Sequence, residues 1–185
     1  KTSSYFELWL DDENVTVDAE GNVHWKEKET EKPKEEPIYG ERYLPRKFKI
    51  GIAADFDNSV DVYTQDIGIL VLTKDGEIEG FEILAGGGLG HSHSKEETYA
   101  RLGTPVTCVG ESKVRDVCEA IIKVQRDFGD REQRHQARLK YTIDRMGQDE
   151  FRKKVEEYYG GELPPATGRK PHEQPDFLGW ADQMD

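Results

Sequence analysis

Apolar residues in the first half of the chain gather in four short stretches that predict strands. In Tyr5 to Leu10 and in Phe48 to Ile52 they recur at every second position, which is the period of a half-buried strand, although the length of Tyr5 to Leu10 leaves a helical turn as the alternative there. Two more strands are predicted at Ile67 to Leu72 and Ile78 to Ala85. The turn between them contains Asp75-Gly76, a strong hairpin signal, so we predict a hairpin within a larger sheet.

The second half of the chain has helical spacing instead. Apolar residues fall three or four apart between Ser112, which we expect to cap a first helix, and Gly129, which we expect to end it. Two further helices are predicted over Arg131 to Met146 and Asp149 to Tyr159, before Pro164-Pro165 marks a boundary. The pattern predicts a single α+β domain in which a mostly antiparallel or mixed β-sheet is covered by helices.

Composition divides the chain into four predicted regions. Residues 1–25 form an N-terminal strand region, and residues 26–37 are almost entirely Lys, Glu, Thr and Pro, which predicts a charged surface insertion. Residues 38–163 form the α+β module, and residues 164–185 are a linker and the start of a next module. The net charge of −12 disfavours binding to nucleic acid, and no apolar run approaches the ~20 residues that span a bilayer, so we expect a cytoplasmic protein.

No metal site is expected in this segment. Cys108 and Cys118 are too few for a disulfide framework or a four-thiolate cluster, and we expect both to be reduced and mostly buried. His91-Ser92-His93 lies in a polar stretch that offers no third ligand nearby in sequence.

Two lysines open the second predicted strand. Because side chains alternate along a strand, Lys47 and Lys49 would share one face, with Cα atoms roughly 6.5–7 Å apart, while Phe48 anchors the other face. Two ammonium groups this close repel each other unless an anion lies between them, so the pair suits an oxyanion that must be held and protonated. The alternative is that the lysines only protect an edge strand from unwanted pairing.

A glycine-rich segment follows the strand predicted at Ile78 to Ala85. Gly86, Gly87 and Gly88 have no side chains, which permits either a sharp structural turn or the close approach of a flat ligand to the backbone. The spacing fits neither the phosphate-binding loop nor the dinucleotide-binding motif. Both interpretations stay open on this evidence.

Four arginines of the predicted second helix would form a cationic stripe, because spacings of three, four and seven fall on one helix face: Arg131, Arg134, Arg138 and Arg145. The stripe could bind an anion, or it could be a solvated face paired with acidic neighbours. RNA binding is disfavoured, since the chain is acidic overall and no aromatic residues for base stacking are interleaved with the arginines.

Six ordered blocks of sequence are similar to a known enzyme family. They are Tyr43-Leu44-Pro45-Arg46-Lys47-Phe48-Lys49, Asp61-Val62-Tyr63-x-x-Asp66, Gly80-Phe81 leading to Gly86-Gly87-Gly88-Leu89, Thr98-Tyr99-Ala100-Arg101, Gln125-Arg126-Asp127-Phe128-Gly129 and Ala137-Arg138-Leu139-Lys140-Tyr141-Thr142. Together, from about residue 40 to 165, they resemble the sirohaem-dependent sulfite and nitrite reductases. Beyond Thr167 the sequence resembles the start of the next module in that family, and both ends are interpreted as cuts in a longer polypeptide.

The resemblance implies two homologous halves that clasp a sirohaem, whose iron is bridged by a cysteine thiolate to a [4Fe-4S] cluster. This chain resembles the first sirohaem-facing module of an assimilatory sulfite reductase, and the cluster cysteines belong to the other half. The chain alone is therefore expected to be inactive and to bind haem weakly or not at all. The implied partners are the remaining half of the reductase, sulfite or nitrite, and a ferredoxin or flavoprotein electron donor, with neither nucleic acid nor membrane.

The resemblance also implies roles for individual residues. Lys47 and Lys49 would bind the oxygens of sulfite and supply protons. Arg46 and Arg138 would pair with the carboxylates of sirohaem, for which the planar guanidinium is the expected partner. The turn at Gly86 to Gly88 would let the backbone approach the macrocycle.

The implied function is a module's share in the six-electron reduction of sulfite to sulfide. Lys49 favours sulfite, because plant-type nitrite reductases tend to resemble Arg-Lys-Trp-Asn at this block. Reduction of nitrite to ammonia stays open as an alternative, as does a non-catalytic module that binds a tetrapyrrole or an anion. For Arg131 and Arg134, a cofactor role and simple pairing with Asp127 and Asp130 both stay open.

Overall fold

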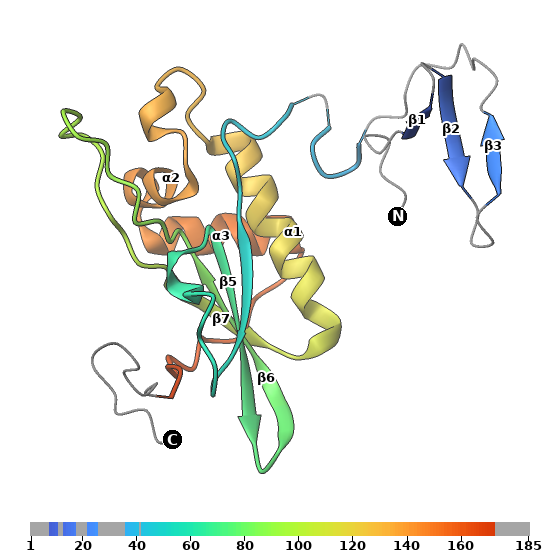
Figure 1. Ribbon diagram of the computed structural model, residues 1–185. Coiled ribbons are helices and arrows are strands. Elements are labelled where there is room, and N and C mark those ends of the chain that lie inside the picture. Colours follow the sequence, from blue (N-terminus) through green and yellow to red (C-terminus); the bar gives the residue numbers. More distant parts are fainter. Residues whose placement is uncertain (1–7, 11–12, 18–21, 26–35, 41, 173–185) are drawn as a thin grey trace, which may run out of the picture. The chain divides into compact units, whose positions relative to one another are not determined.

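Four strands form the sheet around which the larger part of the chain is built. The computed structural model describes residues 8–10, 13–17, 22–25, 36–40 and 42–172. The strands lie in the order β4 (Ile50–Ala54), β5 (Ile67–Lys74), β6 (Glu77–Ala85) and β7 (Thr104–Val109). β4 and β5 are parallel, whereas β5–β6 and β6–β7 are antiparallel. Helices cover one face of this sheet (Figure 1), so the predicted α+β class with a mixed sheet is confirmed.

The hairpin between β5 and β6 forms at the predicted turn. Asp75 and Gly76 have positive φ angles of 53° and 86°, as tight two-residue hairpin turns require. The register pairs Ile67 with Ala85, so the glycines that follow β6 lie beside the residues that precede β5. This pairing brings Gly86 next to Asp66.

β4 is an edge strand and differs from the strand predicted over Phe48 to Ile52. It begins only at Ile50, and the Ile50 and Ile52 side chains are 48% and 61% exposed rather than half-buried. Phe48, which precedes the strand, does pack against the main core. Ile50 and Ile52 are exposed because the helices pack over β5, β6 and β7, whose apolar residues form the sheet side of that core.

β7 has no counterpart among the predicted elements. Pro105 breaks the apolar alternation near its start, and proline cannot donate a hydrogen bond to a neighbouring strand. The strand tolerates it because β7 lies at the edge of the sheet, beside β6 only.

Three helices follow the sheet in sequence: α1 (Glu111–Phe128), α2 (Leu139–Met146) and α3 (Gln148–Tyr159). α1 ends at Gly129 as predicted, but its N-cap is Gly110 and not Ser112, and no side chain caps this end. Its buried face repeats every three or four residues and consists of Val117, Cys118, Ala120, Ile121, Val124 and Gln125.

The helix predicted over Arg131 to Met146 is wrong in its first half. Only the short turn η2 (Arg134–Gln136) precedes α2. The carboxylate of Asp130 accepts the N–H groups of Glu132 and Gln133 at 2.9 and 2.7 Å, and Gln125 Nε2 donates to the carbonyl of Ala137 at 2.8 Å. These side chains compete with the helical hydrogen bonds, so the cationic stripe on one helix face does not form.

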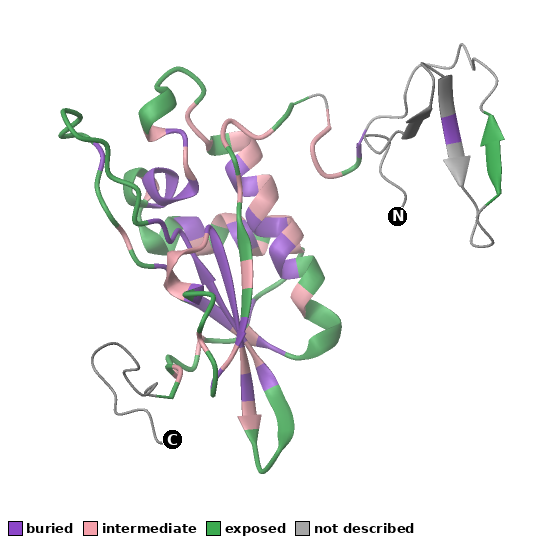
Figure 2. Ribbon diagram, viewed as in Figure 1, coloured by how far each residue is buried: buried purple, intermediate pink, exposed green. Residues whose placement is uncertain are grey.

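Apolar residues fill both sides of the sheet. The larger core lies between the sheet and the helices, and it includes Ile83, Ile121 and Val155, none of which is exposed. The smaller core, on the other side, centres on Leu70, Leu84 and Val62 of η1 (Val62–Thr64). Figure 2 shows the buried residues concentrated in the sheet and on the inner faces of the helices.

Residues 163–172, which we call the C-terminal strap, are hydrogen-bonded to the sheet. The buried carboxylate of Glu82 on β6 accepts the N–H and the hydroxyl of Thr167 at 2.9 and 2.8 Å. The guanidinium of Arg169 pairs with the buried carboxylate of Asp55 at 3.2 Å. The buried carboxylates of Glu82 and Asp55 therefore both have partners in the strap.

Asp55 is further held by Thr73, whose N–H and hydroxyl both donate to its carboxylate at 2.8 Å. Burial by itself acts to raise the pKa of Asp55. The two Thr73 hydrogen bonds and the charges of His172 and Arg169 outweigh it and hold this pKa below its ordinary value. Asp55 is accordingly a charged structural residue.

Residues 1–43 and 44–185 form two compact units. The described part of the first unit is an antiparallel sheet of β1 (Leu8–Leu10), β2 (Glu13–Val17) and β3 (Val23–Trp25). β1 covers the end of the strand predicted at Tyr5 to Leu10, while residues 5–7 and most of the insertion predicted at 26–37 lie outside the described residues. Among the described residues, no helix is long and apolar enough to cross a membrane.

Two isoleucines on β6 provide a matched test of the core. Ile83 is fully buried, whereas Ile78 is 61% exposed. We expect Ile83→Ala to lower the free energy of unfolding by about 2–5 kcal/mol, because it leaves a cavity, and Ile78→Ala to change it by less than about 0.5 kcal/mol. Urea denaturation of the two variants measures both values, and equal losses would contradict this placement of the core.

Candidate functional site

The carboxylate of Asp66 lies at the centre of the candidate site. It is fully buried just before β5, and the N–H of Lys49 donates to its Oδ2 at 3.0 Å. The guanidinium of Arg138 donates from Nη2 to Oδ2 at 2.9 Å and from Nε to Oδ1 at 3.3 Å. The backbone carbonyl of Asp66 also accepts the N–H of Gly86 at 2.9 Å. One residue thus joins three segments in which the sequence predicts site residues.

The basic segment, residues Arg46 to Lys49, carries three cations. Lys47 and Lys49 are exposed, and Arg46 is half-buried. Within the described residues, none of the three side chains makes an ion pair or a hydrogen bond. Most other arginines of this unit are engaged with protein groups, so this segment offers unpaired positive charge to a ligand.

The backbone of the basic segment is nevertheless fixed. Pro45 packs against Gly129 at the end of α1, where a Cβ on the glycine would lie only 2.6 Å from the proline Cγ. At the other end, the carbonyl of Lys49 accepts the N–H of Ile67 at 3.1 Å. The lysines therefore precede β4 rather than lying within a strand, but they are held by the sheet and by α1.

The three glycines of the turn at Gly86–Gly88 are buried, and the protein's own atoms occupy the space beside them. A Cβ would lie 2.6 Å from Ile143 Cδ1 at Gly86, 2.2 Å from Tyr63 O at Gly87 and 2.6 Å from Arg138 Nη1 at Gly88. Gly86 also has a φ of +78°, which favours glycine. These contacts explain why the turn requires glycines for structural reasons. The approach of a macrocycle to the turn stays a prediction.

Lys140, in the first turn of α2, supports the glycine turn although sequence reasoning gave it no role. It is 1% exposed, and its Nζ donates to the carbonyls of Gly88 and Gly90 at 3.1 and 3.0 Å, and to that of Tyr99. Burial, and secondly the charge of Arg138, lower the pKa of Lys140. The sequence signal that could have revealed this role is a lysine beside the apolar positions of a short helix, because a lysine that is buried there needs a hydrogen-bond partner within the protein.

Arg101 also binds the backbone of this turn. Its Nη1 donates to the carbonyl of Gly86 at 2.9 Å, and its Nε pairs with Asp144 at 2.9 Å. Tyr99 donates its hydroxyl to Asp144 at 2.7 Å, and burial together with this hydrogen bond raises the pKa of Tyr99 to about 12. Both residues belong to one block of the family resemblance, and both act here on protein groups.

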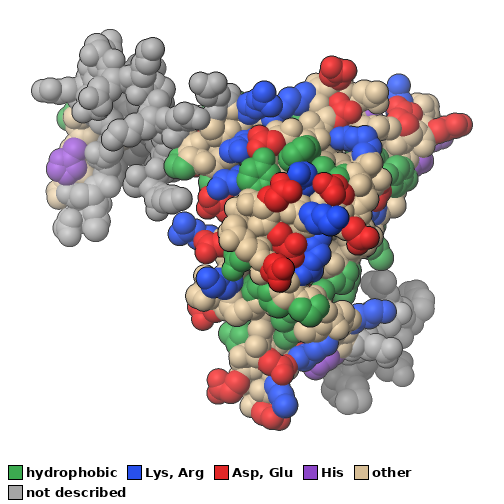
Figure 3. Space-filling model, turned by 180° about the vertical axis from the view of Figure 1, so that it is seen from behind, with side chains coloured by type: hydrophobic (Ala, Val, Ile, Leu, Met, Phe, Trp, Pro, Cys, Tyr) green, Lys and Arg blue, Asp and Glu red, His purple; other side chains and the backbone are tan. Residues whose placement is uncertain are grey.

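Arg131 and Arg134 lie on the exposed loop before α2. Arg131 donates from Nη2 to the carbonyl of Arg126 at 2.7 Å. Asp130, at the start of this loop, pairs with Arg145 of α2 at 3.9 Å. The face shown in Figure 3 carries Lys and Arg side chains interspersed with Asp and Glu, as a solvated surface does.

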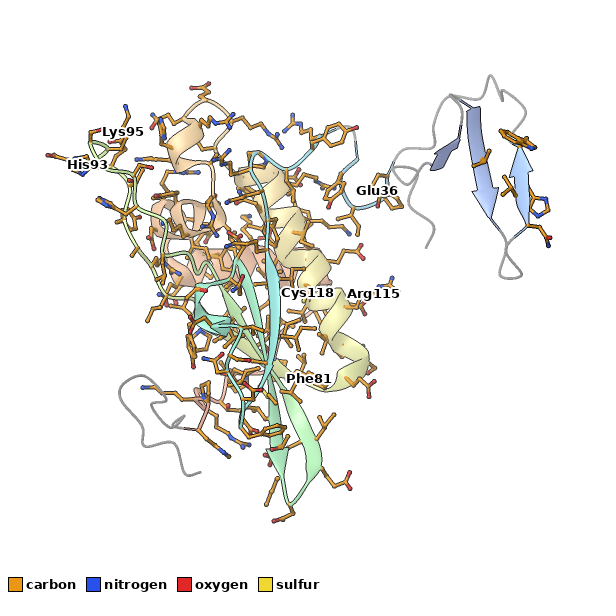
Figure 4. All side chains as sticks on the ribbon, in the orientation of Figure 1. Glu36, Phe81, His93, Lys95, Arg115 and Cys118 are labelled. Atoms are coloured by element: carbon orange, nitrogen blue, oxygen red, sulfur yellow. The ribbon has the colours of Figure 1, made fainter. Side chains whose placement is uncertain are left out.

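The possible metal ligands are scattered. Cys108 on β7 is half-buried and Cys118 on α1 is buried; both are free thiols, as predicted. Burial raises the pKa of Cys118 to about 11, so it is a protonated thiol at neutral pH. His93 lies at the tip of the long loop between β6 and β7, beside Lys95 (Figure 4). No group of three or more His, Cys, Asp or Glu residues in the described ranges is placed to hold a metal ion.

A broad, open hollow of about 900 Å³ lies elsewhere, between the loop after β4 and the C-terminal strap. Its lining includes Phe56, Asp57, Tyr63 and His172, and none of the predicted site residues. The hollow is thus separate from the candidate site, in which Lys47 and Lys49 are exposed and Asp66 is buried.

Residues 5–163 match the family model described as the nitrite and sulphite reductase 4Fe-4S domain. The chain belongs to the nitrite and sulphite reductase family. The match begins well before residue 40, where the six blocks start, so the N-terminal sheet is also part of this family's sequence pattern.

Curated members of the nitrite and sulphite reductase family are similar over the whole chain. The ferredoxin sulfite reductase of Synechococcus elongatus is 41% identical over 100% of this chain and 30% of its own length. The NADPH sulfite reductase hemoprotein beta-component of Staphylococcus carnosus is 41% identical over 98% of this chain and 30% of its own length. The chain therefore spans less than a third of these relatives.

A solved structure has a similar fold. The NirA protein of Mycobacterium tuberculosis aligns with 72% of this chain and 23% of its own, with a TM-score of 0.59 and 29% identity. The mixed sheet with its covering helices therefore has a counterpart in a solved protein of similar sequence.

Two glycines of the turn region provide a test of its packing. We expect Gly87→Ala to lower the free energy of unfolding by about 1–3 kcal/mol, because its Cβ would collide with backbone carbonyls of Tyr63 and Gln65. Gly90→Ala should change it by less than about 0.5 kcal/mol, since nothing lies within 4 Å of the added Cβ. Thermal or urea unfolding checks the pair, and a harmless Gly87→Ala would show that the turn is looser than described.

Proposed function

We propose that this chain is a module of an assimilatory sulfite reductase and contributes substrate and sirohaem contacts to the six-electron reduction of sulfite to sulfide. The single observation that carries this proposal is the basic segment, whose three cations have no partner among the described residues while its backbone is fixed. The two relatives named above are both sulfite reductases, which supports sulfite as the substrate.

Lys47 and Lys49 would perform the substrate chemistry of this module. Their ammonium groups carry the charge that attracts sulfite and the protons that its oxygens need in order to leave as water. Exposure in this chain is consistent with that role, because the substrate must reach them from outside the unit. Arg46 adds a third positive charge beside them.

The residues present fit a cofactor rich in carboxylates. Arg46 and the Nη1 group of Arg138, which makes no hydrogen bond within the described residues, would hold carboxylates of sirohaem. The chemistry that sirohaem supplies when bound is delivery of electrons to the sulfur of sulfite. Arg131 and Arg134, exposed on the loop before α2, are secondary candidates for the same contact.

The chain's own cysteines do not fit a [4Fe-4S] cluster. There are two, one on β7 and one on α1, and burial disfavours the thiolate of each. We therefore assign the cluster ligands to the remaining half of the reductase and expect the isolated chain to be inactive. Free thiols suit a reducing compartment, which favours the cytoplasm.

Three points of this proposal have alternatives. Nitrite is the rival substrate, since the matching family model covers both reductases. The electron donor is left open, because one relative's name gives ferredoxin and another gives NADPH. A non-catalytic module that binds a tetrapyrrole or an anion would use the same basic segment.

The test is turnover of sulfite by the longer protein that contains this chain, loaded with sirohaem and supplied with electrons. We expect sulfite to be preferred to nitrite, and Lys47→Ala and Lys49→Ala each to lower kcat/KM for sulfite by about 10²-fold, a typical loss for a missing proton donor. Lys74→Ala is the control, because Lys74 is also exposed but lies in the β5–β6 turn region.

Faster turnover of nitrite than of sulfite would replace the proposed substrate. Equal kcat/KM values for the three lysine variants would remove the basic segment from the site.

A further inference from the structure

Asp66, Asp55 and Glu82 are three carboxylates buried in the sheet region, and each has hydrogen-bond partners. Asp55 and Glu82 are bound by Thr73 and by the C-terminal strap, and none of these partners is a predicted site residue. The partners of Asp66 are Lys49, Arg138 and Gly86, and all three are predicted site residues. Asp66 therefore differs from Asp55 and Glu82 in its hydrogen-bond partners and not in its burial.

We propose that Asp66 is the positioning residue of this site, which fixes the backbone of Lys49 and the guanidinium of Arg138 relative to each other. The inference rests on the proposed function. Asp66 touches neither substrate nor cofactor in this assignment, because it is fully enclosed. It acts through the two residues bound to its carboxylate.

The bonds to Asp66 leave the ammonium group of Lys49 and the Nη1 group of Arg138 without hydrogen bonds among the described residues. Lys49 uses its backbone N–H for Asp66, and its ammonium group stays exposed. Arg138 uses Nε and Nη2 for Asp66, and Nη2 for the carbonyl of Gly87 at 3.2 Å, so that Nη1 remains available. A ligand bound by the two cations would therefore meet groups whose separation is already set, which lowers the entropic cost of binding.

The negative charge of Asp66 allows a positioning role to be distinguished from a purely electrostatic one. The carboxylate of Asp66 opposes the positive potential of the basic segment, so its removal alone would strengthen attraction of an anion. If Asp66 positions Lys49 and Arg138, its removal weakens binding of sulfite in spite of the gain in positive charge. The two roles predict opposite changes in KM.

The first experiment uses the 185-residue chain without cofactor. Asp66→Ala removes both carboxylate oxygens, so Lys49 N–H and Arg138 both lose their acceptor. We expect the Lys49 amide to lose its protection from hydrogen exchange in Asp66→Ala and to keep it in Asp55→Ala, which removes an equally buried carboxylate away from the site. Retained protection in Asp66→Ala would overturn the proposal.

The second experiment measures sulfite kinetics of the same variants in the longer, sirohaem-loaded protein, with rates normalised to bound cofactor. Positioning predicts that Asp66→Ala raises KM for sulfite by about tenfold or more, and that Asp55→Ala leaves KM unchanged. A lower KM would mean that Asp66 acts only through its charge. An unchanged KM would mean that it is only structural.

Asp66→Glu decides the question if Asp66→Ala does not fold. It keeps the charge but moves the carboxylate by one methylene, so positioning again predicts a raised KM, and an unchanged KM contradicts it. If the wild-type protein reduces no sulfite at all, the proposed function fails, and the hydrogen-exchange result still reports whether Asp66 holds Lys49.

Discussion

The ion pair between Asp66 and Arg138 is the interaction on which this site depends. The two residues lie 72 positions apart in the chain, and the carboxylate is completely buried. A buried charge is costly unless it is paired and its remaining lone pairs are used, and Asp66 meets this requirement with Arg138 and with the N–H of Lys49. Because the same residue also binds Gly86, the basic segment, the glycine turn and the start of α2 share one anchor.

The local features of the fold could be predicted, and those set by distant contacts could not. Asp75-Gly76 determines its hairpin because the required φ angles are a property of the two residues. The helix expected from Arg131 fails because Gln125, a residue of α1, takes the carbonyl of Ala137, and no spacing within the segment reveals that contact. β7 escapes prediction because its proline is acceptable only at an edge, and edge position is a property of the whole sheet.

The candidate site divides in the same way. Lys47 and Lys49 are predicted from the sequence because they stand in a distinctive block, and the structure shows that both are exposed. Asp66 lies in another block of the same resemblance, yet its role becomes visible only when Arg138 is placed beside it. Burial of the glycine turn changes its interpretation too, since Ile143, Tyr63 and Arg138 explain the absence of side chains without any ligand.

The coupling free energy between Asp66 and Arg138 tests the shared anchor most directly. Urea unfolding of the wild-type chain, Asp66→Asn, Arg138→Gln and the double variant measures this energy in a double-mutant cycle. We predict a coupling free energy of about 1–3 kcal/mol, because the second substitution removes a charge whose partner is already gone. Additivity of the two single losses within about 0.5 kcal/mol would show that the two residues do not hold each other, and the shared anchor would be contradicted.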